Sequence, residues 1–287
     1  KEHDITFEMI SDEGTLLTQN IVPGIDKKPV ALIGISEKGY LSVELTCTIA
    51  GGHSSMPADD NAVNVLANAL VNLSKKPFPN KFCEPVNGFI EYMGPEMPFV
   101  QRLAFSNVFL LKDLIFNAYE KSNSGKAMIH TTMTPTIVKA GVKENVVPTQ
   151  AKATLNLRLL PGETIESAVK HITESIADER IEIVVLEGVA NPSAVSNYKT
   201  EAFLQLGLAV KDVYNDALIT PFLMLAATDS RHFEGLSDNI YKFMPVLFES
   251  EDLARFHGVN ERISIENYKK AIQIYGQCIV RWCGTTE

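Results

Sequence analysis

The chain has 287 residues, 45% of them hydrophobic, and a formal net charge of -9 at pH 7. This length suffices for one large or two ordinary domains with a sizeable core. The acidic balance argues against a nucleic acid or an acidic membrane as partner, because both favour a basic surface. No apolar run approaches the roughly 18 residues needed to cross a bilayer, so we expect a soluble protein without a membrane partner.

The four cysteines form no Cys-x-x-Cys pair, which favours free thiols in a reducing compartment over a zinc ribbon. The sequence begins without a methionine or a signal-peptide pattern, so we expect a piece of a longer polypeptide. A targeting signal would lie outside such a piece, and the compartment is therefore undetermined, with the cytoplasm favoured.

The first predicted element is a buried strand at residues 5–10, followed by Ser11-Asp12-Glu13-Gly14. Acidic side chains at a strand end lie where open α/β sheets bind ligands. Asp and Gly also form plain turns, and this segment alone favours the turn. A second strand is predicted at residues 30–35.

An alternating strand over residues 40–50 leads into Gly51-Gly52-His53-Ser54-Ser55-Met56-Pro57. The two glycines allow a sharp turn that presents His53 at the end of the strand. Histidine titrates near neutral pH and can donate a hydrogen bond to a developing oxyanion. The alternative for His53 is a hydrogen-bonded surface residue.

The middle of the chain predicts a ferredoxin-like, split βαβ domain over residues 38–188. After the strand at 40–50, the sequence predicts a capped amphipathic helix at 62–75 and further helical segments to about 119. A polar loop at 120–127 and two strands at 127–140 and 150–160 follow. A second capped helix at 165–178 and a last strand at 181–186 complete the domain.

Residues 189–287 return to a βα pattern and are expected to form one α/β domain with residues 1–37. A helix is predicted at 200–213, strands at 217–223 and 240–245, and a final helix at 265–282. One apolar stripe of the final helix is expected to pack against a sheet: Tyr268, Ala271, Ile272, Tyr275, Ile279 and Trp282.

Polar motifs recur at the predicted loops and strand ends. Asn145 lies in a loop and Arg158 near a strand end, and both side chains can hold a carboxylate, the arginine bidentately. The motifs, in chain order after His53, are Asn145-Val146-Val147-Pro148, Asn156-Leu157-Arg158 with Pro161-Gly162, Thr228-Asp229-Ser230-Arg231, and His257-Gly258-Val259-Asn260-Glu261.

Together with Ser11-Asp12-Glu13-Gly14 and Gly52-His53-Ser54-Ser55-Met56-Pro57, these motifs closely resemble the M20 family of di-zinc metallopeptidases. That family includes carboxypeptidase G, aminoacylase, acetylornithine deacetylase and succinyl-diaminopimelate desuccinylase. The nearest branch is that of yeast carboxypeptidase S and the N-fatty-acyl amino acid hydrolases. The resemblance covers essentially the whole chain. It implies a zinc-binding α/β domain interrupted by a ferredoxin-like lid that also forms a homodimer.

The resemblance also implies roles for individual residues. Asp12 and His257 would each bind a metal ion, with Glu13 as the alternative to Asp12; both residue types are ordinary zinc ligands. His53 would reach the partner subunit's active site and stabilise the oxyanion.

Asn145 and Arg158 would bind the carboxylate of the substrate; the alternatives are a turn residue and a surface arginine. Asp229 and Arg231 would organise the loop of the site.

The chain departs from the family pattern in one respect. The family requires a His-x-Asp motif, a bridging aspartate and a Glu-Glu pair, all of which would precede residue 1, and this sequence contains neither His-x-Asp nor Glu-Glu. A metal that activates water needs several protein ligands. We therefore expect an incomplete α/β domain, incomplete or absent zinc (or cobalt or manganese), and no activity of this chain alone.

Two functions are weighed. The first is a metal-dependent hydrolase acting on N-acyl amino acids or short peptides with a free carboxylate. The second is a non-catalytic dimerisation or binding module, which is favoured if the native protein truly begins near residue 1. A hydrolase using Ser54 or Ser55 with His53 is disfavoured, because neighbours on one turn do not form an oriented nucleophile–base pair.

Overall fold

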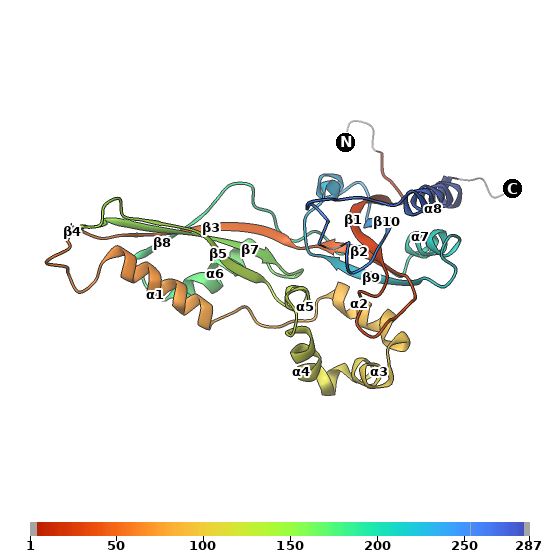
Figure 1. The fold of residues 1–287 in the computed structure, drawn as a ribbon, viewed down its shortest axis with the longest axis horizontal. Coiled ribbons are helices and arrows are strands. Elements are labelled where there is room, and N and C mark those ends of the chain that lie inside the picture. Colours follow the sequence, from red (N-terminus) through yellow and green to blue (C-terminus); the bar gives the residue numbers. More distant parts are fainter. Residues whose placement is uncertain (1–4, 253, 284–287) are drawn as a thin grey trace. The chain divides into compact units, whose positions relative to one another are not determined.

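The structure, a computed structural model, describes residues 5–252 and 254–283. It divides into two compact units (Figure 1). Unit 1 contains Lys1–Glu37, Phe82–Lys121 and Ser193–Glu287, and unit 2 contains Lys38–Lys81 and Ser122–Pro192. Within the described ranges, every helix is too short or too polar to cross a membrane.

Unit 1 is built on a four-stranded sheet of order β1-β10-β2-β9, in which β1 pairs with β10 and β2 with β9 in parallel. Alternate residues of β2 point to opposite faces, so helices can cover both. Ala31, Ile33 and Ile35 pack with residues of α7 and α8, whereas Val30 and Leu32 pack with residues of α2. The bounds are Ile10–Thr18 for β1, Ile240–Phe248 for β10, Val30–Glu37 for β2, Leu218–Met224 for β9, Glu84–Met93 for α2, Glu201–Lys211 for α7 and Ile265–Cys283 for α8.

The helical segment Phe82–Lys121 belongs to unit 1, whereas the sequence predicted one continuous domain over residues 38–188. The reason is the close packing of α2 on β9. A Cβ added to Gly88 would lie 2.7 Å from Cγ of Pro221, and the Phe89 and Phe222 ring centroids are 5.8 Å apart. The segment continues with a 3-10 turn η1 (Gly94–Glu96) and the helices α3 (Phe99–Ser106) and α4 (Val108–Tyr119).

Unit 2 is an antiparallel sheet of order β5-β7-β3-β8 with the helices α1 and α6. The chain order βαββαβ and this strand order confirm the predicted ferredoxin-like architecture. The two helices begin at Asn61 and Thr164, whose side chains accept the hydrogen bonds of the first turn. The bounds are Gly39–Thr48 for β3, Ala62–Lys75 for α1, Thr132–Ala140 for β5, Gln150–Leu159 for β7, Ile165–Ile176 for α6 and Ile181–Val185 for β8.

Two predicted boundaries were wrong. The first strand occupies 10–18 rather than 5–10, because the Asp-Glu-Gly segment bulges out of the strand instead of ending it. The predicted loop at 120–127 and the start of the following strand form a short helix, α5 (Asn123–Ile129), which Ser122 caps through the Gly125 N–H.

The final helix was predicted at nearly its observed bounds, and two residues of its predicted stripe do pack as expected, since Ala271 is buried and Trp282 packs against the unit 1 core. The other four residues of that stripe are exposed, so this part of the prediction was wrong. Ala271, Ile274 and Cys278 of α8 are buried in unit 1. A second apolar stripe is 45% to 76% exposed: Ile265, Tyr268, Ile272, Tyr275 and Ile279. The helix thus carries two apolar stripes, and the sequence does not indicate which of them meets the core.

Candidate functional site

Asp12 lies in β1 beside a bulge. It pairs with Lys242 of β10, and the next aligned residue of β1 is Thr15, so Glu13 and Gly14 leave the ladder. A Cβ on Gly14 would lie 2.7 Å from Cβ of Lys242, so only glycine allows this approach of the two strands.

The hydroxyl of Thr15 ties the bulge to both neighbouring strands. It hydrogen-bonds to the carbonyl oxygens of Leu32 and Lys242 and accepts the Gly34 N–H at 3.0 Å. The bulge and the hydrogen bonds of Thr15 therefore hold the backbone of Asp12, and with it the Asp12 carboxylate, in a fixed position.

The Asp12 carboxylate has one unsatisfied oxygen. Oδ1 accepts the Glu13 N–H at 2.9 Å, whereas Oδ2 is buried and has no hydrogen-bond partner among the described residues. A buried carboxylate oxygen without a partner is costly, so such an atom is suited to an added cation or donor.

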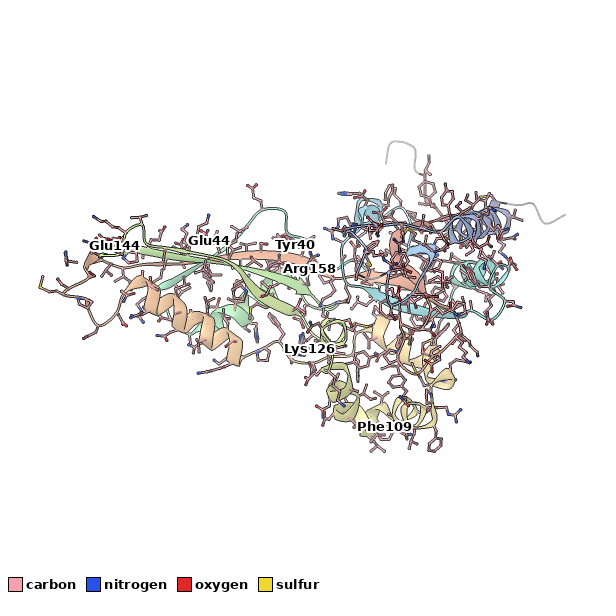
Figure 2. The ribbon with its side chains drawn as sticks, in the orientation of Figure 1. Tyr40, Glu44, Phe109, Lys126, Glu144 and Arg158 are labelled. Atoms are coloured by element: carbon pink, nitrogen blue, oxygen red, sulfur yellow. The ribbon has the colours of Figure 1, made fainter. Side chains whose placement is uncertain are left out.

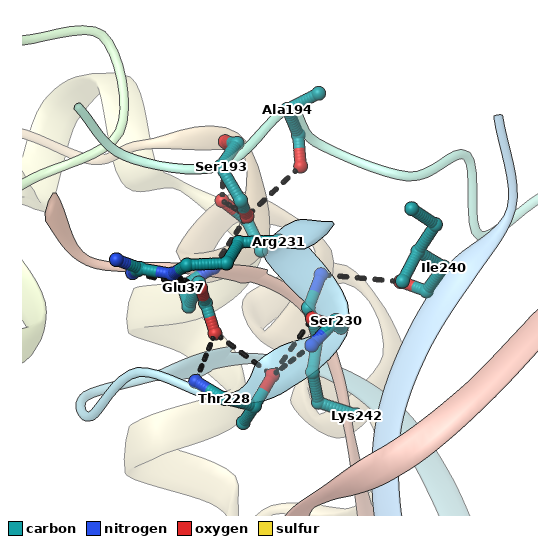
Figure 3. A network of polar contacts seen from close by, with 9 residues as sticks. Glu37, Ser193, Ala194, Thr228, Ser230, Arg231, Ile240 and Lys242 are labelled. Carbon is teal, nitrogen blue, oxygen red and sulfur yellow. Dashed lines mark hydrogen bonds and ion pairs between the residues drawn. The ribbon is translucent and has the colours of Figure 1, made fainter. Parts of the chain in front are cut away.

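Glu37, at the end of β2, is the centre of a buried polar network (Figure 3). Its Oε2 accepts hydrogen bonds from the N–H and hydroxyl of Thr228 at 2.8 and 3.1 Å. Its Oε1 accepts two from the Arg231 guanidinium, at 3.3 and 3.1 Å. Ser193 Oγ accepts the Glu37 N–H at 2.9 Å. This network fixes the loop that carries Asp229, in the manner predicted for Arg231.

The sequence reasoning missed Glu37. The only signal in the sequence is that Glu37 and Lys38 interrupt an otherwise apolar strand, and charges at a strand end commonly face solvent. In the structure both are almost fully buried. In unit 2, the Lys38 ammonium donates to the carbonyl oxygens of Ala127 and His130, each at 2.8 Å. Charged side chains in such a position are usually paired.

Lys242 adds a buried cation near Asp12. Its ammonium donates to the Ile240 carbonyl at 3.3 Å. Burial lowers the pKa of Lys242, and the charges of Glu37, Glu234 and Asp12 partly oppose that shift. The buried part of the site therefore holds charges of both signs.

His257 lies away from Asp12. β10 runs six residues beyond Lys242 to Phe248, which spans about 20 Å. The exposed His257 follows that end of β10, and its neighbour Phe256 packs against Phe248 with ring centroids 5.7 Å apart.

Asp12 and His257 are of the right residue types to bind zinc, but two ligands are too few to hold a catalytic metal ion. A buried carboxylate oxygen and an exposed imidazole are ordinary zinc ligands. However, no group of three or more His, Cys, Asp or Glu side chains able to hold a metal occurs within the described part of the chain. A metal centre therefore does not assemble from these residues of one copy.

His53 and Asn145 are brought together at one end of unit 2. His53 lies in β4 (Gly52–His53), which pairs with β6 (Val146–Val147), so Asn145 immediately precedes the partner strand. The Asn145 carbonyl accepts the Ser54 N–H at 3.3 Å. The His53 ring is exposed, and its Nδ1 accepts the Ser55 N–H at 3.2 Å and contacts Ser55 Oγ at 2.8 Å.

Arg158 lies toward the other end of the same sheet. Its guanidinium stacks on the Tyr40 ring, with the central carbon 4.8 Å from the ring centroid. Gln150, at the other end of β7, pairs with Thr48 near the His53 turn, and the eight-residue step from Gln150 to Arg158 spans about 26 Å. One chain therefore does not bring Arg158 to Asn145. Figure 2 shows Arg158 beside Tyr40 and far along the sheet from Glu144.

The sequence is similar to those of known hydrolases. A family profile described as peptidase dimerisation domain matches residues 35–183. The chain is 36% identical over 270 residues to the probable carboxypeptidase S-like 2 of Dictyostelium discoideum, covering 94% of this chain and 52% of that protein. It is 34% identical over 280 residues to an N-fatty-acyl-amino acid synthase/hydrolase of Danio rerio, covering 96% and 54%.

The fold is similar to that of an M20 family metallo-carboxypeptidase from Sulfolobus solfataricus. The TM-score is 0.65 at 18% sequence identity, over 96% of this chain and 63% of the other. The chain thus spans about half the length of the curated relatives that it matches.

Proposed function

Because this chain belongs to the M20 peptidase family, we propose that it forms part of a metal-dependent amidohydrolase. The proposed substrates are N-acyl amino acids or short peptides with a free C-terminal carboxylate. Water adds to the amide carbonyl, and the bond to nitrogen breaks to give a carboxylic acid and an amine. The names of the relatives, carboxypeptidase S-like and N-fatty-acyl-amino acid synthase/hydrolase, support this class.

The observation that carries the proposal is the tautomer imposed on His53. Because the Ser55 N–H donates to Nδ1, the neutral ring keeps its proton on Nε2. Nε2 can then donate a hydrogen bond to the oxygen of the carbonyl under attack, where negative charge develops. His53 is thus an oxyanion donor rather than a general base in this arrangement.

A complete site would combine two copies of the chain. Arg158 is suited to bind the substrate carboxylate, but it lies about 26 Å of strand away from the end that carries His53 and Asn145. We therefore assign Arg158 to one copy and His53, with Asn145, to its partner. The match to a peptidase dimerisation domain supports a homodimer formed through unit 2.

Zinc is the proposed metal, with cobalt or manganese as alternatives. Asp12, with its unpaired Oδ2, and His257 would supply ligands, and a bound metal would supply a Lewis acid and an activated water. Two ligands do not hold a catalytic metal tightly, so this chain by itself is proposed to be inactive.

The test compares the 287-residue chain with its whole gene product, both supplied with zinc, by release of free amino acid from N-acyl amino acids and dipeptides. We expect hydrolysis by the whole product alone. His53→Ala should lower kcat by about 100-fold or more with a smaller change in KM. Arg158→Ala should mainly raise KM. Metal-independent hydrolysis by the chain alone would contradict the proposal.

The second candidate is a non-catalytic dimerisation module. It is favoured by the apolar edge of the unit 2 sheet, where Val184 and Val185 of β8 are exposed. In that case the chain would dimerise, and the whole gene product would hydrolyse none of these substrates.

A further inference from the structure

Two cations of β7, Lys152 and Arg158, lie on the face of the unit 2 sheet that points away from α1 and α6. Their surroundings differ. The Lys152 ammonium is 2.6 Å from the Glu44 carboxylate, so its charge is neutralised. Among the described residues, no carboxylate pairs with the Arg158 guanidinium, and its central carbon lies 4.8 Å from the centroid of the Tyr40 ring (Figure 2). An aromatic ring thus takes the place beside Arg158 that a carboxylate takes beside Lys152.

The Tyr40 backbone is fixed on both sides. Tyr40 lies directly opposite Arg158 in the ladder between β3 and β7, and on its other side it exchanges two backbone hydrogen bonds of 2.8 Å with Ala190. Residues directly opposite each other in an antiparallel pair have Cβ atoms about 4.5–5.5 Å apart, so their side chains are neighbours on one face. The contact between Tyr40 and Arg158 therefore follows from the register of the sheet.

A short chain of hydrogen bonds holds the far end of the Tyr40 ring. The Ser42 hydroxyl donates to the Tyr40 hydroxyl at 3.2 Å and accepts a hydrogen bond from the Asn156 amide, also at 3.2 Å. Ser42 is only 9% exposed, so water competes little for these groups. The ring is therefore restrained both at its backbone and at its hydroxyl.

An aromatic ring restrains a guanidinium without neutralising its charge. The long arginine side chain loses rotamer entropy when a ligand fixes it, which weakens binding. A ring that already holds the guanidinium reduces this loss. It contacts one face of the guanidinium plane, so the N–H groups at the edge of the plane remain available to a bidentate carboxylate.

We propose that Tyr40 is a positioning residue, which holds the Arg158 guanidinium ready for the carboxylate of the substrate. The assignment rests on the proposed function, in which Arg158 binds that carboxylate. Tyr40 acts on substrate binding through Arg158 and takes no part in the attack on the amide bond. The ring makes the contact with Arg158, whereas the hydroxyl only orients the ring.

The kinetic test uses the zinc-loaded whole gene product and the substrate that it hydrolyses fastest among N-acyl amino acids and dipeptides. Tyr40→Leu keeps an apolar side chain in the strand but removes the ring. It should raise KM about fivefold and change kcat by less than about twofold. Tyr40→Phe is the matched control, because it keeps the ring, and its KM should stay within about twofold of the parent value. An unchanged KM in Tyr40→Leu would overturn the proposal.

A double-mutant cycle separates positioning from a general loss of structure. In an Arg158→Ala background, Tyr40→Leu should change KM by less than about twofold, because the group through which Tyr40 acts is already gone. An equal rise of KM in both backgrounds would contradict the proposal, since an effect that does not need Arg158 is merely structural.

A measurement on the 287-residue chain does not depend on catalysis. The Nε–H group of Arg158 is followed by NMR relaxation of its nitrogen, and its signal is assigned by its loss in Arg158→Lys. The order parameter should be high in the parent chain and in Tyr40→Phe, and lower in Tyr40→Leu. Equal order parameters in all three would refute the positioning role. If they differ as expected while the whole gene product hydrolyses no substrate, the proposed function fails and the positioning of Arg158 by Tyr40 stands.

Discussion

At the scale of single residues, Glu37 shows how a buried charge organises a loop that is remote in sequence. The carboxylate is bonded by Thr228 and Arg231, 191 and 194 residues further along the chain. Both carboxylate oxygens of Glu37 accept hydrogen bonds from residues of unit 1. The loop that carries Asp229 therefore owes its position to one glutamate.

Glu37→Ala should lower the free energy of unfolding by about 3–5 kcal/mol, because it leaves the Arg231 charge and the Thr228 N–H without their partner. The measurement is urea denaturation. The control is Glu96→Ala, which removes an exposed ion pair with Lys28 and should cost less than about 1 kcal/mol. Equal losses in the two variants would show that the Glu37 network contributes little.

The sequence predicted one half of this contact and not the other. Thr228-Asp229-Ser230-Arg231 was recognisable as an organising motif from its polar residues between two strands. Glu37 was not, because a charge at the end of an apolar strand more commonly marks the exit to solvent. Whether Glu37 is exposed or buried in an ion pair depends on Thr228 and Arg231, which lie more than 190 residues away in the sequence.

At the scale of elements, β1 shows how glycine keeps a strand continuous where the sequence suggests a turn. Glu13 and Gly14 bulge outward, and pairing with β10 resumes at Thr15. The predicted turn was a reasonable interpretation, since alternation stops at this point. What restores the strand is the long-range ladder with β10, which local sequence does not encode.

Gly14→Ala should destabilise the chain by about 1–3 kcal/mol, because its Cβ would meet the Lys242 side chain at 2.7 Å. Gly52→Ala is the matched control, since no atom lies within 4 Å of the added Cβ. Thermal unfolding of both variants checks this prediction. A Gly14→Ala variant as stable as the control would mean that the strands separate at little cost.

Helix patterns were predictable to different degrees. The helices α1 and α6 of unit 2 were found at nearly their observed bounds, because Asn61 and Thr164 each cap a helix whose apolar stripe has one core to face. The pairing of β4 with β6 was not predicted, since two residues per strand carry no periodicity. It is this short pairing that places His53 beside Asn145.

At the scale of the whole molecule, the two edges of the unit 2 sheet differ. The edge strand β5 contains Pro135 and an irregular register between Pro135 and Ile137, both of which hinder pairing with another strand. The opposite edge, β8, has no proline and exposes Val184 and Val185. We therefore expect β8 to be the edge at which two copies associate.

Val184→Lys should weaken the dimer by about tenfold or more, because it places like charges at an edge that meets its own copy. Light scattering across a dilution series measures the effect. Val138→Lys on β5 is the matched control and should leave the association unchanged. A stronger effect of the control would move the interface to the β5 edge.

The spacing of the exposed apolar residues on α8 limits how another helix could pack against this face of unit 1. Its apolar residues recur at steps of three and four, so a facing helix finds them in line every seven residues, or about 10.5 Å along the axis. Between those positions it meets Lys269 and Gln273 instead. A helix packed on this stripe would therefore be held at axial positions about 10.5 Å apart.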